Sequence, residues 1–502
     1  MTFPRSSGVL LHPTSLPGPH GSGDLGPAAF HFVDWLATAK QRLWQILPLG
    51  GIGPGNSPYM SSSAFAGNLL LIDLAELQQR GWLDEADLQP DAGFSQSRIN
   101  FDIVAPWRMA RLQQAAACFA QTASAPEQID FADFCLHHAS WLEDYALFMT
   151  LAEHHSGRDW CDWPATLARR ETQALQQAGS AHAERIAFWK FGQWCFFRQW
   201  KNLRVHANQR GVKIVGDAPI FIACQSAEVW ARQELFELDA DGRPTVVAGV
   251  PPDFFSATGQ RWGNPLYRWS THAAEGYAWW IERVRRIFEL VDIVRIDHFR
   301  GFAGYWEIPA SEPNAIRGRW LPGPGAALFH AIEAALGELP IIAEDLGLIT
   351  PDVDALRHEF SLPGMRILQF AFDEDGDNTN AYLPHNYDTN TVVYTGTHDN
   401  NTTQGWWKEA SPALRRQVLA YLGLGADNNG DDIHWHLIHA ACASVADTAI
   451  HPLQDVLGLG GEHRMNQPGQ GEGHWEWRFG WEQVQPVHAE QLARLGRLYR
   501  RE

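Results

Sequence analysis

Short, uninterrupted apolar runs recur along the whole chain, and each one ends in a polar loop or in a loop rich in glycine and proline. Runs without alternation of apolar and polar residues are typical of parallel strands that are covered on both faces. Segments with helical spacing lie between them, such as 27–40, which begins with proline. The eight runs cover residues 9–11, 44–49, 212–215, 291–296, 340–343, 365–372, 391–394 and 446–450.

Eight strand–helix units in one chain predict an α/β fold, a (β/α)8 TIM barrel with helix-rich insertions between strands. A doubly wound open sheet is the alternative. We predict a single catalytic barrel domain over residues 1–502, with a helical insertion subdomain at 74–209 after the second strand. Helices are expected there at 107–120, 141–154 and 184–209, the last one buried because it is apolar nearly all round. Smaller insertions are expected at 218–275, 309–325 and 453–480.

The composition excludes several classes of partner. The formal net charge is −19 and the pI is near 5.6, which argues against a nucleic acid or an anionic membrane surface and favours a neutral substrate. Neither a signal peptide nor an apolar run of membrane-spanning length is found, so we expect a soluble cytoplasmic protein. Six cysteines without CxxC spacing predict reduced thiols. A monomer and a homodimer both remain open.

Tryptophan is unusually frequent, with 23 residues against 10 tyrosines. Most of these rings are expected in a large aromatic core. Some of them are candidates for a ligand surface, because the axial hydrogens of a sugar ring pack on a flat aromatic face.

Carboxylates follow several of the predicted strands. In a barrel the carboxyl ends of the strands line the active site, so these side chains should converge on one mouth. Taken singly, an acidic residue after a strand is usually a turn former or a helix cap. The five residues are Asp217, Asp297, Glu344, Asp373 and Asp399.

The segment 295–300 is the most informative. On a strand, Arg295 and Asp297 point to the same face, and the guanidinium would keep the carboxylate ionised, as a nucleophile requires. Glu344, above an apolar strand, is a candidate general acid with a raised pKa. The structural alternatives are an Arg–Asp pair, a helix cap by Asp345, and a second cap near Asp399.

Two neighbouring carboxylates and a third acid are the groups that retaining glycosyl chemistry needs. One attacks the anomeric carbon, and the other protonates the leaving oxygen and later deprotonates the acceptor. Retention requires the two carboxyl groups to be about 5–5.5 Å apart.

Three other signals are weaker. The glycine-rich loop at 50–55 lacks the register of a dinucleotide-binding loop. The DAD triplet at 239–241 resembles a metal-binding motif of nucleotide-sugar transferases, but it runs into Gly242 and predicts a tight turn. The 22 histidines include no recognisable metal-ligand spacing, so no metal is expected.

Ten short segments along the chain form a recognisable set. They are 12–18 (HPTSLPG), 57–59 (SPY), 63–68 (SAFAGN), 216–220 (GDAPI), 249–253 (GVPPD), 259–265 (GQRWGNP), 295–301 (RIDHFRG), 343–347 (AEDLG), 396–399 (GTHD) and 464–469 (RMNQPG). In these segments the chain resembles the amylomaltases, or 4-α-glucanotransferases, of glycoside hydrolase family 77 in the α-amylase clan. The segments span most of the chain in the family's order, and the resemblance is weakest across the helical insertion.

The resemblance implies transfer of an α-1,4-glucan segment from one maltooligosaccharide to the 4-hydroxyl of another glucan or of glucose, without cofactor or metal. It implies Asp297 as the nucleophile, Glu344 as the acid and base, and Asp399 as the residue that strains the sugar. Where most of the clan has Asn-His, this chain has Phe221-Ile222, which fits the family and argues against an ordinary amylase. The implied substrate-binding residues are Tyr59, Asp217, Asp253, Gln260, Trp262, Arg295, Asp373, His398 and Asn466, with the 218–275 insertion as a lid.

Three other functions compete with transfer. The nearest is an α-1,4-glucan hydrolase of the same clan, and another is a non-catalytic glycan-binding protein on a barrel. A sugar-phosphate enzyme would need a glycine-rich loop after the last strands, for which 457–461 is a weak match.

Overall fold

The computed structural model describes residues 3–252, 256–347, 349–374 and 376–502. Its core is a sheet of eight parallel strands in the order β10-β11-β12-β1-β2-β3-β6-β9. Each of the eight apolar runs overlaps one of them, although 44–49 and 365–372 are strand only at their beginnings. The strands are β1 (Ser6–Leu10), β2 (Leu43–Gln45), β3 (Lys213–Pro219), β6 (Ile293–Asp297), β9 (Ile341–Ala343), β10 (Gly364–Ile367), β11 (Thr391–Tyr394) and β12 (Thr448–Pro452).

Two contacts join β9 and β10, the outermost strands in this order. The amide of Ala343 donates to the carbonyl of Pro363 at 2.9 Å, and the amide of Met365 donates to Asp345 Oδ1 at 2.6 Å. The sheet therefore curls into a nearly closed barrel, as predicted, and the open-sheet alternative is wrong. Close packing also restricts the strands, because a Cβ at Gly8 would lie 2.4 Å from Leu43 Cβ.

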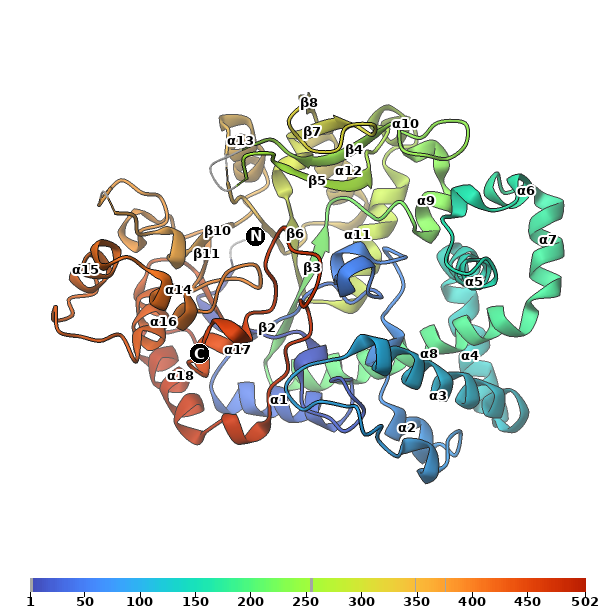
Figure 1. Cartoon of the computed structure of the whole chain (residues 1–502), viewed down its shortest axis with the longest axis horizontal. Helices are drawn as coiled ribbons and strands as arrows, with labels where there is room; N and C mark the ends of the chain where they lie inside the picture. The colour runs from blue at the N-terminus through green and yellow to red at the C-terminus, as the bar shows by residue number, and fades with distance from the viewer. Residues whose placement is uncertain (1–2, 253–255, 348, 375) are drawn as a thin grey trace.

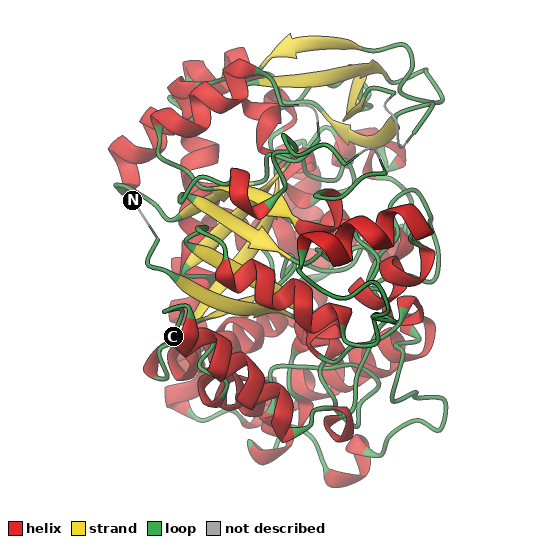
Figure 2. Cartoon of the chain, turned by 90° about the vertical axis from the view of Figure 1, so that its left-hand side faces the viewer, coloured by secondary structure: helices red, strands yellow, loops and turns green. Residues whose placement is uncertain are grey.

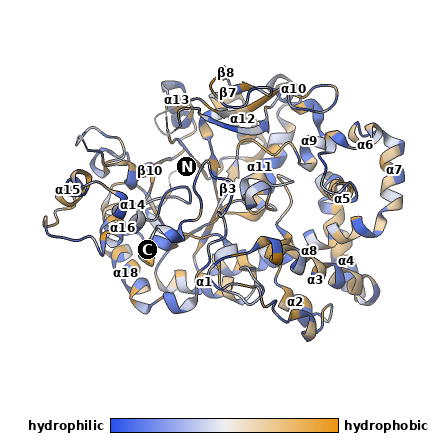
Figure 3. Ribbon diagram, in the orientation of Figure 1, coloured by the Kyte–Doolittle hydropathy of each residue, from blue (hydrophilic) through white to orange (hydrophobic). Residues whose placement is uncertain are grey.

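Helices surround the barrel (Figures 1 and 2). Hydrophobic and hydrophilic residues lie side by side along them, as expected for helices with one buried face (Figure 3). Among the described residues, none of the helices combines the length and the apolar character that a membrane span requires. Outside the β2–β3 connection the helices are α1 (Pro27–Thr38), α9 (Ala227–Ala231), α10 (Trp269–Ala274), α11 (Ala278–Leu290), α12 (Ala326–Leu336), α13 (Pro351–Glu359), α14 (Thr403–Glu409), α15 (Pro412–Tyr421), α16 (Ile433–Ala443), α17 (Leu453–Val456) and α18 (Pro486–Leu498).

The connection between β2 and β3 is helical, and Figure 1 shows it to one side of the barrel. The three helices expected in it are present as α3, α5 and α8, and the aromatic residues of α8 are largely buried. The helices of this connection are α2 (Leu74–Gln79), α3 (Phe101–Thr122), α4 (Ala125–His137), α5 (Ala139–His154), α6 (Ala165–Ala168), α7 (Thr172–Ala181) and α8 (Ala183–Gln209).

A second sheet was not expected from the sequence. It is antiparallel, has the order β5-β4-β7-β8, and lies at the top of Figures 1 and 2. It unites the two segments that were interpreted as the separate insertions 218–275 and 309–325. Its strands are β4 (Val246–Val250), β5 (Gln260–Pro265), β7 (Gly304–Pro309) and β8 (Arg319–Pro322).

Arg501 joins the beginning and the end of the chain. Its fully buried guanidinium donates to backbone carbonyls only, including those of Ser6 at 3.1 Å, Cys442 at 2.8 Å and Ala446 at 2.8 Å. The amide of Ser7 donates in turn to the carbonyl of Arg501 at 3.2 Å. One side chain thus connects β1 with the end of α16 and the approach to β12.

Replacing Arg501 by alanine is expected to lower the free energy of unfolding by about 3–5 kcal/mol, because several buried carbonyls lose their donors and a cavity remains. Denaturant unfolding of the variant measures this loss. The control is Arg497→Ala on the exposed side of α18, which should change stability by less than about 1 kcal/mol. Equal effects of the two substitutions would contradict this role of Arg501.

Candidate active site

Adjacent strand ends bring four of the predicted residues to one place. In the register of β3 with β6, Asp217 pairs with Arg295 and Pro219 with Asp297. In the register of β6 with β9, Ile296 pairs with Ala343, so Glu344 follows directly. The carboxyl ends of three neighbouring strands therefore present an arginine and three carboxylates to the barrel mouth, as predicted.

Arg295 connects two of these carboxylates. Its Nη1 donates to both oxygens of Asp217 at 2.8 and 2.7 Å, and its Nη2 lies 3.0 Å from Asp297 Oδ1. Desolvation raises the pKa of the Asp297 carboxyl, and the adjacent guanidinium opposes that rise by stabilising the carboxylate. Asp217 is buried, whereas 31% of the Asp297 side chain stays exposed. Asp297 is thus a paired carboxylate that a substrate can reach.

Glu344 is held by two backbone amides. Its Oε2 accepts from His298 N at 2.7 Å and its Oε1 from Leu346 N at 2.8 Å. Desolvation nevertheless raises the pKa of Glu344 to about 7, and the nearby negative charge of Asp297 adds to the rise. A carboxyl group with this pKa is protonated in a large fraction of molecules at neutral pH, so it can serve as both acid and base.

His298 was not among the predicted site residues. Its backbone is left-handed, with φ 56° and ψ 46°, a conformation that few non-glycine residues adopt. This geometry accompanies the hydrogen bond of its amide to Glu344. Its ring packs edge-to-face on Trp262 with a centroid distance of 4.8 Å, and its buried Nε2 has no hydrogen-bond partner among the described residues. Strained backbone of this kind is common at functional sites.

Tyr59 links Asp217, the hydrogen-bond partner of Arg295, to the loop that carries Asp399. The Tyr59 hydroxyl donates to Asp217 Oδ2 at 2.8 Å and lies 3.0 Å from His398 Nε2, and the two rings stack at 5.3 Å. His398 Nε2 lies 3.4 Å from Asp399 Oδ1, and Asn466 Nδ2 donates to the same oxygen at 2.6 Å. Five predicted residues thus form one polar chain, in which 43% of the Asp399 side chain is exposed.

A buried carboxylate that the sequence analysis missed fixes this loop. Asp455 Oδ2 accepts from the hydroxyls of Thr395 at 2.6 Å and Thr403 at 2.8 Å, and Asp455 Oδ1 accepts from the Thr403 amide at 2.7 Å. These two threonines flank the segment that contains His398 and Asp399. Asp455 lies on α17, which follows β12, whereas the two threonines follow β11. The contact therefore joins segments that are far apart in the sequence, and the sequence gave no signal for it.

The remaining predicted residues lie around this centre or beyond it. Trp262 Nε1 donates to Gln260 Oε1 at 3.1 Å on β5, next to His298. Asp373 accepts from the amides of Gly376 at 2.7 Å and Asp377 at 3.3 Å, both within its own turn. Asp253 lies outside the described residues. The structure therefore brings Gln260 and Trp262 to the site, whereas the hydrogen bonds of Asp373 to other described residues stay within its own turn.

The structural alternatives for these segments have different outcomes. The Arg–Asp pair is present, because Arg295 is ion-paired with Asp297. Asp345 accepts from the Met365 amide, between β9 and β10, and the N-cap of α13 is Thr350 instead, while Glu344 is held by amides rather than simply solvated. The second cap after Asp399 is also present, because the Thr402 hydroxyl accepts from Gly405 N at 3.0 Å. The triplet at 239–241 forms the expected turn, with Asp239 Oδ1 accepting two amides.

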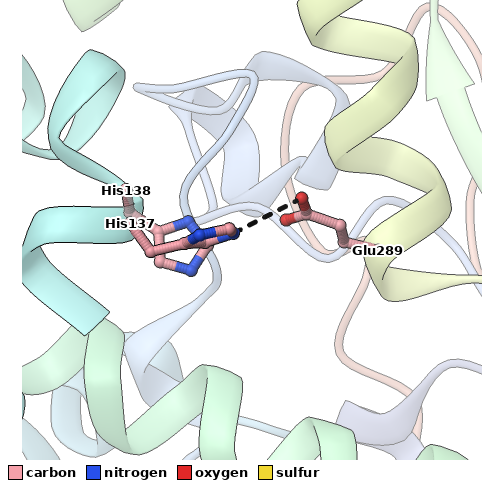
Figure 4. A group of neighbouring side chains, drawn as sticks. All are labelled: His137, His138 and Glu289. Atoms are coloured by element: carbon pink, nitrogen blue, oxygen red, sulfur yellow. Dashed lines mark ion pairs between the residues drawn. The ribbon is translucent and has the colours of Figure 1, made fainter. Parts of the chain in front are cut away.

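One trio of side chains elsewhere has the composition of a metal site. His137, His138 and Glu289 come together between α4, α5 and α11 (Figure 4). However, Arg286 Nη1 donates to both oxygens of Glu289 at 2.9 Å and lies 3.1 Å from His138 Nδ1. A guanidinium already supplies the positive charge there, so we assign this trio to structure rather than to metal binding.

Known proteins resemble this chain over nearly its full length. The profile of the family described as 4-alpha-glucanotransferase matches residues 11–483. The 4-alpha-glucanotransferase of Thermus thermophilus is 52% identical over 98% of both chains, and that of Synechocystis is 48% identical over 99% of this chain and 98% of its own. The amylomaltase of Streptococcus agalactiae, solved in complex with acarbose, superposes with a TM-score of 0.95 at 37% identity, covering 99% of each chain.

Proposed function

The chain belongs to the 4-α-glucanotransferases of glycoside hydrolase family 77, and on that basis we propose that Asp297, Glu344 and Asp399 perform its reaction. The reaction transfers an α-1,4-glucan segment between maltooligosaccharides. The proposal rests on two carboxyl groups that lie at the ends of neighbouring strands. One is Asp297, which is ion-paired with Arg295, and the other is Glu344, whose pKa is about 7.

In the first step, Asp297 attacks the anomeric carbon while Glu344 protonates the leaving 4-oxygen. This step forms a covalent glycosyl–enzyme and releases the shortened glucan. In the second step, Glu344, now a carboxylate, removes the proton from an acceptor 4-hydroxyl, which attacks the same carbon and frees Asp297. Two inversions give net retention of the α configuration.

Asp399 and its partners act on the sugar at the cleavage site. Asn466 donates a hydrogen bond to one oxygen of Asp399, and the hydrogen bonds between Asp455 and the flanking threonines fix the loop around it. The other oxygen of Asp399 can therefore hold hydroxyls of a strained sugar without any rearrangement of the protein. The same polar chain continues away from Asp399 through His398 and Tyr59 to Asp217. Asp253 and Asp373 remain predicted contacts to hydroxyls farther along the glucan.

We propose that transfer exceeds hydrolysis because the second sheet and its connections shield the intermediate from water. Trp262 on β5 contacts His298 directly beside Asp297, which supports the role of the 218–275 segment as a lid. Residues 74–209 would form a helical subdomain of the same barrel domain. The substrates would be maltooligosaccharides and glucose in the cytoplasm, with no nucleic acid or membrane partner.

Incubation with maltotriose alone tests this function. Transfer produces glucose together with a ladder of longer oligomers, whereas the competing hydrolase produces only glucose and maltose. The ladder should be absent when Asp297→Asn replaces the wild-type protein. Accumulation of glucose and maltose without longer products would contradict transfer.

The pH dependence of kcat/KM should reflect Glu344. A raised carboxyl pKa means that Glu344 keeps its proton up to about pH 7 and loses it above that value. The first step needs the protonated form, so kcat/KM should fall about tenfold per pH unit above about pH 7. At low pH, protonation of Asp297 removes the nucleophile. Initial rates with maltotriose between pH 4 and 9 measure both limbs, and a profile that stays flat to pH 9 would exclude Glu344 as the acid.

A further inference from the structure

Two thiols that are distant in sequence lie together beside the barrel. Cys161 is in the short turn Trp160–Asp162 between α5 and α6, and Cys224 is in the loop between β3 and α9. Trp160 fastens the two segments, because its indole Nε1 donates to the Cys224 carbonyl at 2.8 Å and its amide donates to Gln225 Oε1 at 2.9 Å. The backbone on both sides of the thiol pair is therefore fixed.

The two side chains lie close enough to shift each other's pKa. The Cys161 thiol donates to the Gly242 carbonyl at 3.2 Å. The neighbouring Cys224 thiol, together with the nearby Arg243 guanidinium, lowers the pKa of Cys161 against the opposing effect of burial and of the Asp159 and Asp162 carboxylates. Both cysteines are free and half-buried, so a small reagent can reach them.

The other four cysteines differ from this pair. Burial raises the pKa of the Cys195 thiol to about 12 and that of the Cys135 and Cys442 thiols to about 11, which disfavours the reactive thiolate. Cys118 hydrogen-bonds to Thr122 and to the Gly81 carbonyl rather than to a second thiol. Cys161 and Cys224 are therefore the pair that combines two neighbouring thiols, partial exposure and a stabilised thiolate.

We propose that Cys161 and Cys224 form a redox site that closes to a disulfide by exchange with a small disulfide such as oxidised glutathione. The Cys161 thiolate attacks one glutathione sulfur, a mixed disulfide forms, and one glutathione leaves as its thiolate. Cys224 then gives up its proton and attacks the Cys161 sulfur, which releases the second glutathione. The protein loses two protons and two electrons, and one oxidised glutathione becomes two reduced molecules.

Intact-mass spectrometry and non-reducing peptide mapping of the full chain, treated with oxidised glutathione, test the proposal. We expect the wild type to lose two hydrogens, to retain no glutathionyl group, and to yield a peptide that joins Cys161 to Cys224. The Cys224→Ser variant should instead retain one glutathionyl group on Cys161, because no second thiol resolves it. The Cys161→Ser variant should react at least about tenfold more slowly at position 224, since Cys224 is the poorer nucleophile.

Cys118→Ser is the matched control and should form the cross-link like the wild type. Glucan-transfer activity of each variant confirms that it is folded. The oxidised wild type should also melt several degrees higher than the reduced protein and return to the lower value with dithiothreitol, because the cross-link constrains the unfolded chain. Failure of the wild type to form the cross-link, or equal glutathionylation rates in the two serine variants, would overturn the proposal.

Discussion

Replacing Asp297 by asparagine is expected to lower kcat for glucan transfer by about 10⁴-fold or more, because an amide cannot form the glycosyl ester. The substitution keeps the size of the side chain, and Arg295 retains its two hydrogen bonds to Asp217. Binding of a maltooligosaccharide, measured by calorimetry, should therefore change by less than about tenfold. Initial transfer rates with maltotriose give the loss of kcat.

The matched control for this variant is Asp354→Asn on α13, a half-exposed aspartate away from the strand ends. It should leave both kcat and binding unchanged. If Asp297→Asn kept kcat within tenfold of the wild type, Asp297 would not be the nucleophile, and a glycan-binding or differently arranged site would have to be considered.

Replacing Glu344 by glutamine should lower kcat on maltooligosaccharides by about 10³-fold or more, because neither the leaving oxygen nor the acceptor exchanges its proton. The effect should depend on the leaving group. With an α-glucosyl fluoride donor, fluoride leaves without protonation, so the first turnover should stay within about tenfold of the wild-type rate. A burst of fluoride followed by slow turnover is the expected time course.

Two further observations separate the acid from the base role of Glu344. Azide, which needs no deprotonation, should release the trapped intermediate and restore turnover in the Glu344→Gln variant. The decline of the rate above about pH 7 should also be absent with the fluoride donor. A variant that is equally slow on fluoride and on maltotriose would show that Glu344 does more than transfer protons.

The barrel could be predicted from the sequence because its strands are buried on both faces. Such strands are continuous apolar runs that need no knowledge of their partners. The second sheet could not be predicted in this way. Its strands contain glycine and proline, which are unfavourable in strands. In addition, β4 pairs with β7 although the barrel strand β6 lies between them in the sequence, and periodicity does not reveal pairing between distant segments.

The geometry of the candidate site could be predicted from the sequence only in part. Strand alternation placed Arg295 and Asp297 on one face, and their ion pair confirms it. The left-handed backbone of His298 and the clamp by Asp455 were missed, because a positive φ at histidine has no sequence signature and the clamp joins separate strand ends. The pKa of Glu344 likewise depends on desolvation by groups that only the fold brings together.

The most direct measurement is the identification of the residue that carries the sugar. The Glu344→Gln variant, quenched with acid shortly after mixing with α-glucosyl fluoride, should contain one glucosyl group on the peptide that includes Asp297, as located by tandem mass spectrometry. The product formed with azide should have the α configuration. A glucosyl group on any other residue, or a β-configured product, would contradict the mechanism.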